Sequence, residues 1–382
     1  MVKLSRIKSV GAVAAVSAFA LMFSACGSDS AVTSSSAAPS TASETATAEP
    51  TETVVALAPA NLAGAGASAQ ESAQEAWKAE FMNLHPEITI SYDPVGSGGG
   101  REQFLNGGVV FAGTDAAMNE EELQQSIAIC GEGGGYDLPL YISPFVVIFN
   151  LDGIDELNMT PATIAKIFTG QITNWNDPEI AADNPDAALP DLAITPVHRS
   201  DESGTTKNFT DYLAATAPDV WTFEPSGTWP MEGGQSDQGT SGVISTVQGG
   251  QGTIGYADAS KVGTLGTVAV QVGDEFVAFS PEGAALVVDA SPLVEGRPEH
   301  DYAIKLDRTT TEPGAYPLVL ISYILVCSEY EDEAVGNAVV EYIRFIASEE
   351  GQAYSATAAG SAPISDEMRT NVMAALDSIK VG

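Results

Sequence analysis

Apolar and polar positions along the chain repeat an order of strand, turn and helix. Residues 54–57 are expected to form a strand that leads into a glycine turn, residues 71–84 a helix, and residues 88–92 the next strand. Such segments, joined by connections of only a few residues, favour α/β layers on a mainly parallel sheet. The pattern therefore predicts an α/β fold class.

Two runs, 145–149 and 318–326, are the most apolar of the expected folded body. Runs of this kind are typical of strands covered on both faces, and periodicity alone leaves a buried helix open as the alternative. Residues 160–170 predict a short helix, because Thr160 can cap it, Pro161 suits its first turn and Gly170 ends it. The chain contains no internal repeat.

The first 25 residues predict a leader. Three basic residues precede the apolar or small run 10–25, and Cys26 follows this run directly. A membrane-spanning helix needs about 20 apolar residues, so the shorter run indicates a signal peptide over 1–25. A cysteine at this place resembles a bacterial lipobox, which implies a lipid anchor on Cys26. A plain secretory signal with an incidental cysteine is the alternative.

Residues 26–53 change to Ser, Thr, Ala, Pro and Glu with almost no large apolar side chains. Such a segment cannot bury enough apolar surface to offset its ordering entropy. It is expected to be a disordered tether between the anchor and a folded body that begins at Val54. The expected location is the cell membrane, with the body held by its lipid at the extracytoplasmic face.

Length and charge narrow the classes of partner. The 382 residues suit two domains. A net charge of −36 opposes binding to nucleic acid or to anionic lipid head groups. A small anion is not excluded, because screening over about 8 Å leaves a buried site under the control of its own lining.

The cysteines and histidines are too few and too scattered for a metal site of these ligands. His85, His198 and His300 have no ligand spacing between them. If Cys26 carries a lipid, Cys130 and Cys327 remain as a pair in an oxidising compartment, where a disulfide is one option. The other option is a free thiol that packs as a small hydrophobe.

Glycine followed by Ser or Thr precedes an expected helix at three places. The first turn of a helix has unpaired N–H groups and partial positive charge, so each junction can hold an anion. Glycine lets the backbone approach closely, and a hydroxyl adds a donor. For any one junction, ordinary helix capping is the simpler interpretation. The three junctions are 64–69, 96–100 and 202–206.

Charged residues lie beside one of these junctions and after one further short turn. If 194–199 is a strand, Arg199 lies at its carboxyl end, where ligands bind in open α/β sheets. Arg199 can give a two-pronged contact to an oxyanion, and Asp201 can hold the guanidinium plane. A surface ion pair is the alternative for this pair. Asp115 follows another short turn, where capping of a helix over 119–126 is the alternative.

Together these segments resemble the phosphate-binding protein of the bacterial phosphate-uptake ABC transporter, over about residues 57–365. The chain departs from that family's common pattern at Ala69-Gln70, where relatives usually have an aromatic residue followed by Pro. The motifs that carry the resemblance occur in the same order: Ala63-Gly-Ala-Gly-Ala-Ser68, Val95-Gly-Ser97-Gly-Gly, Phe111-Ala-Gly-Thr-Asp115, Ile164-Ala-Lys-Ile-Phe-Thr-Gly170 with Trp175-Asn-Asp-Pro-Glu-Ile180, Arg199-Ser-Asp-Glu-Ser-Gly-Thr205, Gly252-Thr-Ile-Gly-Tyr256 and Tyr316-Pro-Leu.

The resemblance implies a two-lobed periplasmic-binding-protein fold of type II, which closes on one phosphate in the interlobe cleft. Lobe I is expected over 54–144 and 311–382, and lobe II over 145–310. The resemblance implies no enzymatic activity, no metal and no cofactor. The implied partners are inorganic phosphate and the permease and ATPase subunits of the transporter. The expected ligand-binding residues are Ser68, Ala69 through its amide, Ser97, Asp115, Arg199, Ser203, Gly204 and Thr205, with Asp201 bracing Arg199.

Asp115 gives a physical reason for selectivity. An ionised carboxylate only accepts hydrogen bonds, so it requires a proton on the ligand, which hydrogen phosphate has and sulfate lacks at neutral pH. An unpaired acceptor in a buried site costs about 1–3 kcal/mol. Asp115 is therefore expected to reject sulfate by penalty. The same fold with sulfate, molybdate or a phosphonate is the alternative.

Two enzymatic interpretations compete with binding. A secreted phosphatase would need an activated serine, but the chain has no G-x-S-x-G elbow, and on a strand His198 points away from the face of Arg199. Residues 64–69 also imitate a dinucleotide fingerprint, with Glu87 near the expected acidic position. Export and the lack of any other cofactor feature argue against a nicotinamide cofactor.

Overall fold

The computed structural model describes residues 56–382, which belong to one compact unit that begins at Val54. The expected signal peptide, Cys26 and the tether lie outside the described residues. Within the described part, no helix combines the length and the apolar composition needed to cross a membrane.

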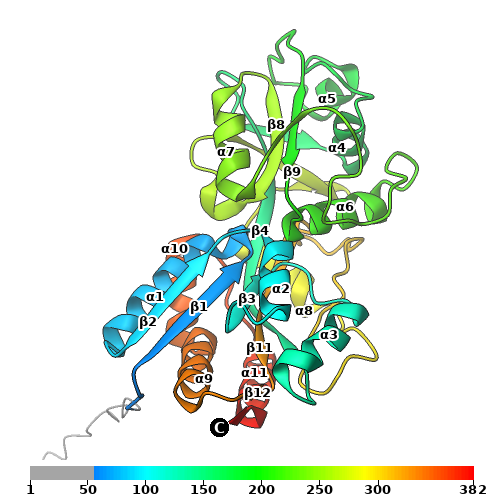
Figure 1. The fold of residues 1–382 in the computed structure, drawn as a ribbon. Coiled ribbons are helices and arrows are strands. Elements are labelled where there is room, and N and C mark those ends of the chain that lie inside the picture. The colour runs from blue at the N-terminus through cyan, green and yellow to red at the C-terminus, as the bar shows by residue number, and fades with distance from the viewer. Residues whose placement is uncertain (1–55) are drawn as a thin grey trace, which may run out of the picture. The chain divides into compact units, whose positions relative to one another are not determined.

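The first core is an α/β layer (Figure 1). Strand β1 (Ala60–Gly66) lies between β2 (Ile88–Asp93) and β3 (Phe111–Thr114), and both pairings are parallel. The 3₁₀ turn η1 (Ser68–Gln70) leads into α1 (Glu71–Leu84), as the apolar spacing predicts. The other helices before β4 are α2 (Ser97–Leu105) and α3 (Glu120–Cys130); those near the C-terminus are α9 (Glu333–Ala347), α10 (Glu349–Ala359) and α11 (Asp366–Ser378), with the short pair β12 (Glu329–Tyr330) and β13 (Lys380–Val381).

The first strand begins later than expected. Residues 56–59 lie outside any strand, and β1 contains Gly64 and Gly66, which were expected in a turn. The reason is packing: a Cβ on Gly64 would lie 2.2 Å from the ring of Phe111 on the neighbouring strand. The Phe111 ring can pack against β1 only because the residue at position 64 has no side chain.

The second core is built by the middle of the chain (Figure 1). Helix α4 begins after Thr160, whose side chain accepts the amide N–H of Thr163, so the expected short helix is confirmed. The elements of this part are β5 (Glu156–Met159), α4 (Pro161–Phe168), α5 (Pro178–Asp183), β6 (Thr195–Arg199), α6 (Gly204–Thr216), β7 (Gln235–Asp237), α7 (Gly239–Gly249), β8 (Thr253–Asp258), η2 (Ala259–Lys261), β9 (Gly266–Val272) and β10 (Glu275–Val277).

Two long strands run through both cores. In β4 (Gly135–Phe149), Leu138–Ile142 contribute to the first core and Phe145–Phe149 to the second. Strand β11 (Val319–Cys327) pairs with β4 along its whole length. Both apolar runs singled out in the sequence are therefore buried strands.

The expectation of a mainly parallel sheet is wrong. Strand β11 is antiparallel to β3 and to β4, and β4 is antiparallel to β8 and β9. The sheet is mixed because β4 and β11 cross between two parallel layers in opposite directions. The α/β class itself is confirmed.

Helix α8 (Pro281–Asp289) bears on the predicted lobe boundaries. It lies within 145–310, the segment expected as lobe II, yet Ala284, Val287 and Val288 pack in the first core. The boundaries of the two lobes stay a prediction, and these contacts favour placing α8 with lobe I.

Cys130 at the end of α3 and Cys327 at the end of β11 are joined by a disulfide. Their separation of 197 residues makes the bond a link between distant parts of the first core. Such a link restricts the unfolded chain more than a short-range one does.

Helix α3 is capped by Asn119, so the alternative role for Asp115 is wrong. The Asn119 side chain accepts the amide N–H of Glu122 at 2.9 Å, and the Glu122 carboxylate accepts the amide N–H of Asn119 at 2.9 Å. This reciprocal pair satisfies the first turn of the helix. Asp115 is left available for the site.

Asn119→Ala is expected to lower the free energy of unfolding by about 1 kcal/mol, because it removes the N-cap acceptor. The measurement is urea unfolding followed by circular dichroism. Asn119→Asp is the matched control, since it keeps an acceptor and is expected to stay within about 0.5 kcal/mol of the wild type. Equal losses in the two variants would contradict the capping role.

Candidate anion-binding site

The N-terminal ends of helical segments meet between the first and second cores. The N-terminal residues Ser97 of α2 and Gly204 of α6 lie opposite each other, and a Cβ on Gly204 would be 2.5 Å from Ser97 Oγ. Ser68 of η1 faces Thr240 of α7 in the same way, with their hydroxyl oxygens 3.0 Å apart. The unpaired amides of such turns favour an anion between them.

Asp115 lies at the centre of this arrangement and is 4% exposed. Its amide donates to Ser97 Oγ at 3.1 Å, and its Oδ2 accepts from the Thr205 hydroxyl at 3.1 Å. Its Cβ would be 2.6 Å from a Cβ on Gly204. Asp115, Ser97, Gly204 and Thr205 thus lie together, although they come from three separate parts of the chain.

The hydroxyl groups at the site divide into two kinds. Ser97 Oγ accepts the amide N–H of Asp115, and Ser203 Oγ accepts that of Thr206 at 3.1 Å. Each of these serines therefore keeps its own hydrogen for donation to an anion. Thr205 uses its hydrogen on Asp115, so we expect its amide to contact a ligand.

Burial is the main influence on Asp115 and raises the pKa of its carboxyl above the ordinary value. Hydrogen bonds from Ser322 and Thr205 and the charges of Arg199 and Arg101 act in the opposite direction. The carboxylate is the acceptor in a site otherwise made of donors.

Arg199 ends β6 and is 4% exposed. Its Nε donates to Asp201 Oδ1 at 2.7 Å and its Nη2 to Asp201 Oδ2 at 2.5 Å. Asp201 Oδ1 also accepts the amide N–H of Gly239 at 3.3 Å. One edge of the guanidinium is held by this pair, which leaves its Nη1 group to reach an anion.

Gly96 makes this close approach to Arg199 and Asp201 feasible. Its φ of +95° lies in the region that favours glycine, and a Cβ there would be 2.4 Å from Asp201 Oδ2. The neighbouring Gly98 amide donates to the Glu202 carbonyl at 3.3 Å, and Arg101 pairs with the Glu202 carboxylate at 3.2 Å. These contacts hold α2 against the loop before α6.

The structure brings the predicted site residues together. Contacts link Ser97, Asp115, Gly204 and Thr205 directly. Arg199 and Asp201 form a second group, which lies next to Gly96, the residue before Ser97. Ser68 lies near this second group, because Asp201 accepts the amide N–H of Gly239 and a Cβ on Gly239 would lie 3.7 Å from Ser68 Cβ. Ala69 and Ser203 adjoin Ser68 and Gly204 in the chain. Their contact with a ligand stays a prediction.

Sequence reasoning missed Thr240. Its amide donates to Ser68 Oγ at 3.0 Å, and the residue is 1% exposed. The available signal was the Gly-Thr pair at the start of α7, Gly239-Thr240, which repeats Gly204-Thr205 at the start of α6.

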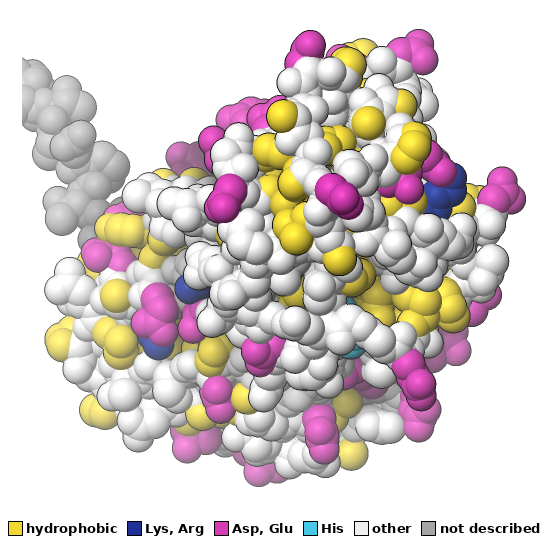
Figure 2. Space-filling view, turned by 90° about the horizontal axis from the view of Figure 1, so that it is seen from above, with side chains coloured by type: hydrophobic (Ala, Val, Ile, Leu, Met, Phe, Trp, Pro, Cys, Tyr) yellow, Lys and Arg dark blue, Asp and Glu magenta, His cyan; other side chains and the backbone are white. Residues whose placement is uncertain are grey.

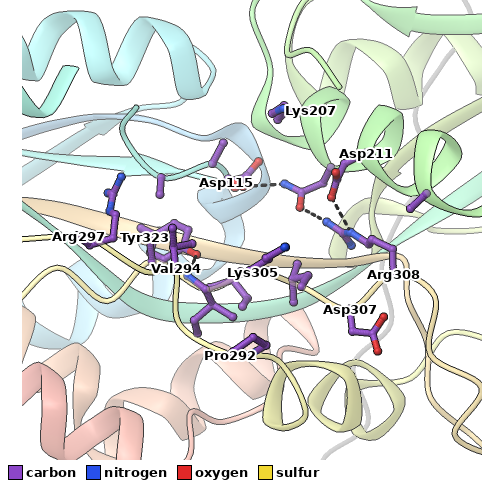
Figure 3. A pocket seen from close by; sticks show the side chains of 18 of the residues that line it. Asp115, Lys207, Asp211, Pro292, Val294, Arg297, Lys305, Asp307, Arg308 and Tyr323 are labelled. Carbon is purple, nitrogen blue, oxygen red and sulfur yellow. Dashed lines mark hydrogen bonds and ion pairs between the residues drawn. The ribbon is translucent and has the colours of Figure 1, made fainter. Parts of the chain in front are cut away.

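Sequence reasoning also missed Asn208 and Arg308. Asn208 Nδ2 donates to the carbonyl oxygens of Asp115 at 2.6 Å and of Gly204 at 2.9 Å, so it joins the two sides of the site. The Asn208 Oδ1 in turn accepts from the buried guanidinium of Arg308 (Figure 3). Neither residue belongs to a local motif that would reveal this role.

A pocket of about 810 Å³ lies beside the cluster, and Asp115 is the one predicted ligand residue that lines it. The segment 290–309, α6 and the residues after β3 form its walls (Figure 3). Two of its cations are already paired, Arg297 with Asp137 and Asp301, and Arg308 with Asp211. Because the other predicted ligand residues lie outside this pocket, the predicted anion site is placed at the donor cluster.

The residues of the competing enzymatic interpretations are engaged elsewhere. The ring of His198 stacks on Trp229 with centroids 4.9 Å apart, and its Nδ1 is 2.9 Å from the Arg199 carbonyl oxygen. Glu87 pairs with His85 at 3.5 Å. Neither arrangement places a base beside Ser68, Ser97 or Ser203.

Acidic side chains are common on the surface of the molecule, as the net charge of −36 requires. Figure 2 shows Asp and Glu side chains spread over the face drawn, with few Lys or Arg among them. Attraction for an anion must therefore come from the buried donors and from Arg199.

Comparison with known proteins gives consistent results. Residues 35–350 match the family described as PBP superfamily domain. The chain is 32% identical to "Phosphate-binding protein PstS3" of Mycobacterium bovis, over 96% of this chain and 98% of the relative. It is 34% identical to "Phosphate-binding protein PstS 2" of Mycobacterium tuberculosis, over 74% of this chain and 78% of that protein.

Solved structures show the same fold. A high-affinity periplasmic phosphate-binding protein (PfluDING), solved with phosphate, matches with a TM-score of 0.69 at 19% identity, over 85% of this chain and 96% of that one. A phosphate-binding protein from Stenotrophomonas maltophilia matches with a TM-score of 0.63 at 20% identity, over 82% and 93%. The fold is the type II periplasmic-binding-protein fold, as expected. The chain therefore belongs to the PBP superfamily and, within it, to the family of the phosphate-binding proteins named PstS.

Proposed function

We propose that the protein binds inorganic phosphate outside the cytoplasmic membrane and delivers it to the permease of an ABC transporter, whose ATPase drives uptake. The relatives that cover nearly the whole chain are named for phosphate binding. Family and relatives are binding proteins, and we infer that this chain is not an enzyme.

One observation carries the choice of ligand: a single buried carboxylate lies among hydroxyl and amide donors. Donors alone would accept any oxyanion of the right size, because each oxygen of such an anion accepts hydrogen bonds. Asp115 adds an acceptor and so matches an anion that carries both oxygens and a proton. Hydrogen phosphate has this combination.

The proposed ligand contacts follow from hydrogen-bond direction. Ser97 and Ser203 have hydroxyl hydrogens free to donate, and Arg199 has its Nη1 group. The amides of Ser68, Ala69, Gly204 and Thr205 would complete the donor set. Because donors from both cores would bind one anion, ligand binding would favour the closed conformation, in which the two cores lie against each other.

The test is calorimetric titration of the purified protein, stripped of bound ligand, with phosphate and separately with sulfate at neutral pH. One-to-one phosphate binding without a sulfate signal is the expected result. Sulfate, molybdate or phosphonate binding in place of phosphate would assign another oxyanion. Hydrolysis of a phosphate monoester during the assay would instead support the secreted phosphatase.

Asp115→Asn is expected to raise sulfate affinity relative to phosphate by about tenfold, because the side-chain amide of Asn supplies a donor where the wild type has only acceptors. Competition of sulfate against labelled phosphate at neutral pH measures this ratio. Asp201→Asn is the control, since it weakens the brace of Arg199 and is expected to lower the affinity for both anions. An unchanged ratio in Asp115→Asn would remove the selectivity argument.

The lipid anchor on Cys26 belongs to the same proposal. A lipidated Cys26 followed by a tether would hold the folded body at the extracytoplasmic face. Mass spectrometry of the membrane-purified protein is expected to find an acylated cysteine at the mature N-terminus. A soluble product cleaved elsewhere would support the plain secretory signal.

A further inference from the structure

A series of buried side chains reaches Asp115 from the first core. Ser322 Oγ donates to Asp115 Oδ1 at 2.6 Å, and Gln70 Nε2 donates to Ser322 Oγ at 2.6 Å. Gln74 Nε2 donates to Gln70 Oε1 at 2.9 Å, and the Tyr342 hydroxyl donates to Gln74 Oε1 at 3.0 Å. All five residues are buried, and four of them are 0% exposed. Water therefore does not compete for these bonds.

The direction of each bond in this series is determined by groups that have one role only. Gln70 Nε2 also donates to the carbonyl oxygen of Tyr323 at 3.0 Å, and a carbonyl oxygen only accepts. The opposite amide orientation would place two acceptors against each other, so the NH₂ group of Gln70 faces Ser322. Because Ser322 Oγ accepts that N–H, its single hydrogen points to Asp115.

We propose that Ser322, oriented by Gln70, is a specificity-determining positioning residue: it keeps Asp115 Oδ1 an acceptor, so the anion that meets this carboxyl must bring its own proton. The proposal rests on the proposed function, because it explains how the same site selects among oxyanions. Ser322 lies on β11, which runs through both cores. In this proposal Ser322 acts on the ligand through Asp115 and does not contact the ligand itself.

The surroundings of Asp115 give the direction of the expected effect. Burial raises the pKa of Asp115, whereas the bonds from Ser322 and Thr205 and the charges of Arg199 on β6 and Arg101 on α2 lower it. Loss of the Ser322 hydroxyl removes one of the lowering contributions, so Asp115 takes up a proton at a higher pH. The other titratable groups that the charge of Asp115 reaches are Tyr92 on β2, Tyr141 on β4 and Asp258 on β8.

Ser322→Ala is therefore expected to lose sulfate rejection at a higher pH than the wild type. Sulfate carries no proton in the neutral to mildly acidic range, and a protonated Asp115 can donate to it. At mildly acidic pH the sulfate-to-phosphate affinity ratio is expected to rise about tenfold over the wild type, the effect of one hydrogen bond to a charged group. Gln70→Leu is expected to act in the same direction with a smaller effect, because Ser322 loses the donor that orients it.

The experiment is displacement of labelled phosphate by sulfate over a pH series, with variant and wild type compared at each pH. Because phosphate has the same protonation state in both measurements at a given pH, its own titration cancels when the variant is compared with the wild type. Ser322→Thr keeps the hydroxyl and is expected to keep the wild-type profile. Ser355→Ala is the matched control: Ser355 is also 0% exposed, but its hydroxyl donates to the Gln352 carbonyl on α10.

The possible outcomes distinguish failure of the role of Ser322 from failure of the proposed phosphate-binding function. A Ser322→Ala profile that superimposes on the wild type, or an equal shift in Ser355→Ala, would overturn the role of Ser322. Absence of phosphate binding in the wild type would overturn the proposed function instead. Thermal unfolding identifies any variant that fails to fold, and Gln70→Leu then tests the same series of bonds from its other end.

Discussion

Gly204→Ala is expected to weaken phosphate binding by about fivefold to over a hundredfold while the protein stays folded. A Cβ at this position would lie 2.5 Å from Ser97 Oγ and 2.6 Å from Asp115 Cβ, so it would push the two sides of the site apart. Overpacking of this kind costs about 1–3 kcal/mol, and each 1.4 kcal/mol is tenfold in Kd. Alanine is a better helix former than glycine, so α6 itself is not weakened. Calorimetric titration with phosphate measures the change.

Gly249→Ala is the matched control for this prediction. Gly249 lies at the end of α7, and outside its chain neighbours and its own helix backbone no heavy atom lies within 4 Å of the position that a Cβ would take. The same chemical change is therefore expected to leave the phosphate Kd within about twofold of the wild type, as is usual for a surface substitution. Similar affinities in the two variants would show that the contact of Gly204 with Ser97 and Asp115 does not persist in the bound state.

Arg308→Met is expected to lower the free energy of unfolding by about 3–5 kcal/mol, the usual result of removing one member of a buried polar network. Arg308 is 4% exposed. It donates to the carbonyl oxygens of Pro317 at 2.7 Å and Val319 at 2.9 Å, and also to Asn208 and Asp211. Methionine fills much of the space but leaves these acceptors unpaired. Urea unfolding followed by tryptophan fluorescence gives the difference.

Arg344→Met makes the same substitution at a solvated site. The Arg344 side chain is 35% exposed and pairs with Glu341 at 3.4 Å and Asp377 at 3.0 Å. Ion pairs of this kind contribute about 0–1 kcal/mol, so a small loss is expected. A loss as large as that of Arg308→Met would mean that burial of the network is not what stabilises this region.

The local elements of the fold could be predicted from the sequence because periodicity and capping are local. The helix over Glu71–Leu84 and the capped helix after Thr160 follow from spacing and turn residues alone. The direction of neighbouring strands could not be predicted in this way. Strand β11 pairs with β3 and β4 from a distant part of the chain, and its apolar pattern is the same for either direction.

In the candidate site, too, the local features could be predicted from the sequence and the long-range contacts could not. Its glycine-rich turns are local motifs, and they led to the residues that the structure gathers around Asp115. The partners of those residues are not local: Thr240 is 172 positions from Ser68, and Ser322 is 207 positions from Asp115. Only tertiary contact reveals a serine in an otherwise apolar strand as a hydrogen-bond donor to the site.

The long strand β4 has a mechanical consequence. Its fifteen residues span about 50 Å at roughly 3.3 Å per residue, and its pairing with β11 shifts register between Ser322 and Tyr323. An irregularity of this kind bends a strand and redirects its side chains. The two cores are therefore joined by paired β-strands and not by a flexible linker. Because Ser322 lies beside this irregularity and donates to Asp115 Oδ1, a change in the bend of the sheet at this point would also move the hydroxyl that orients the Asp115 carboxyl.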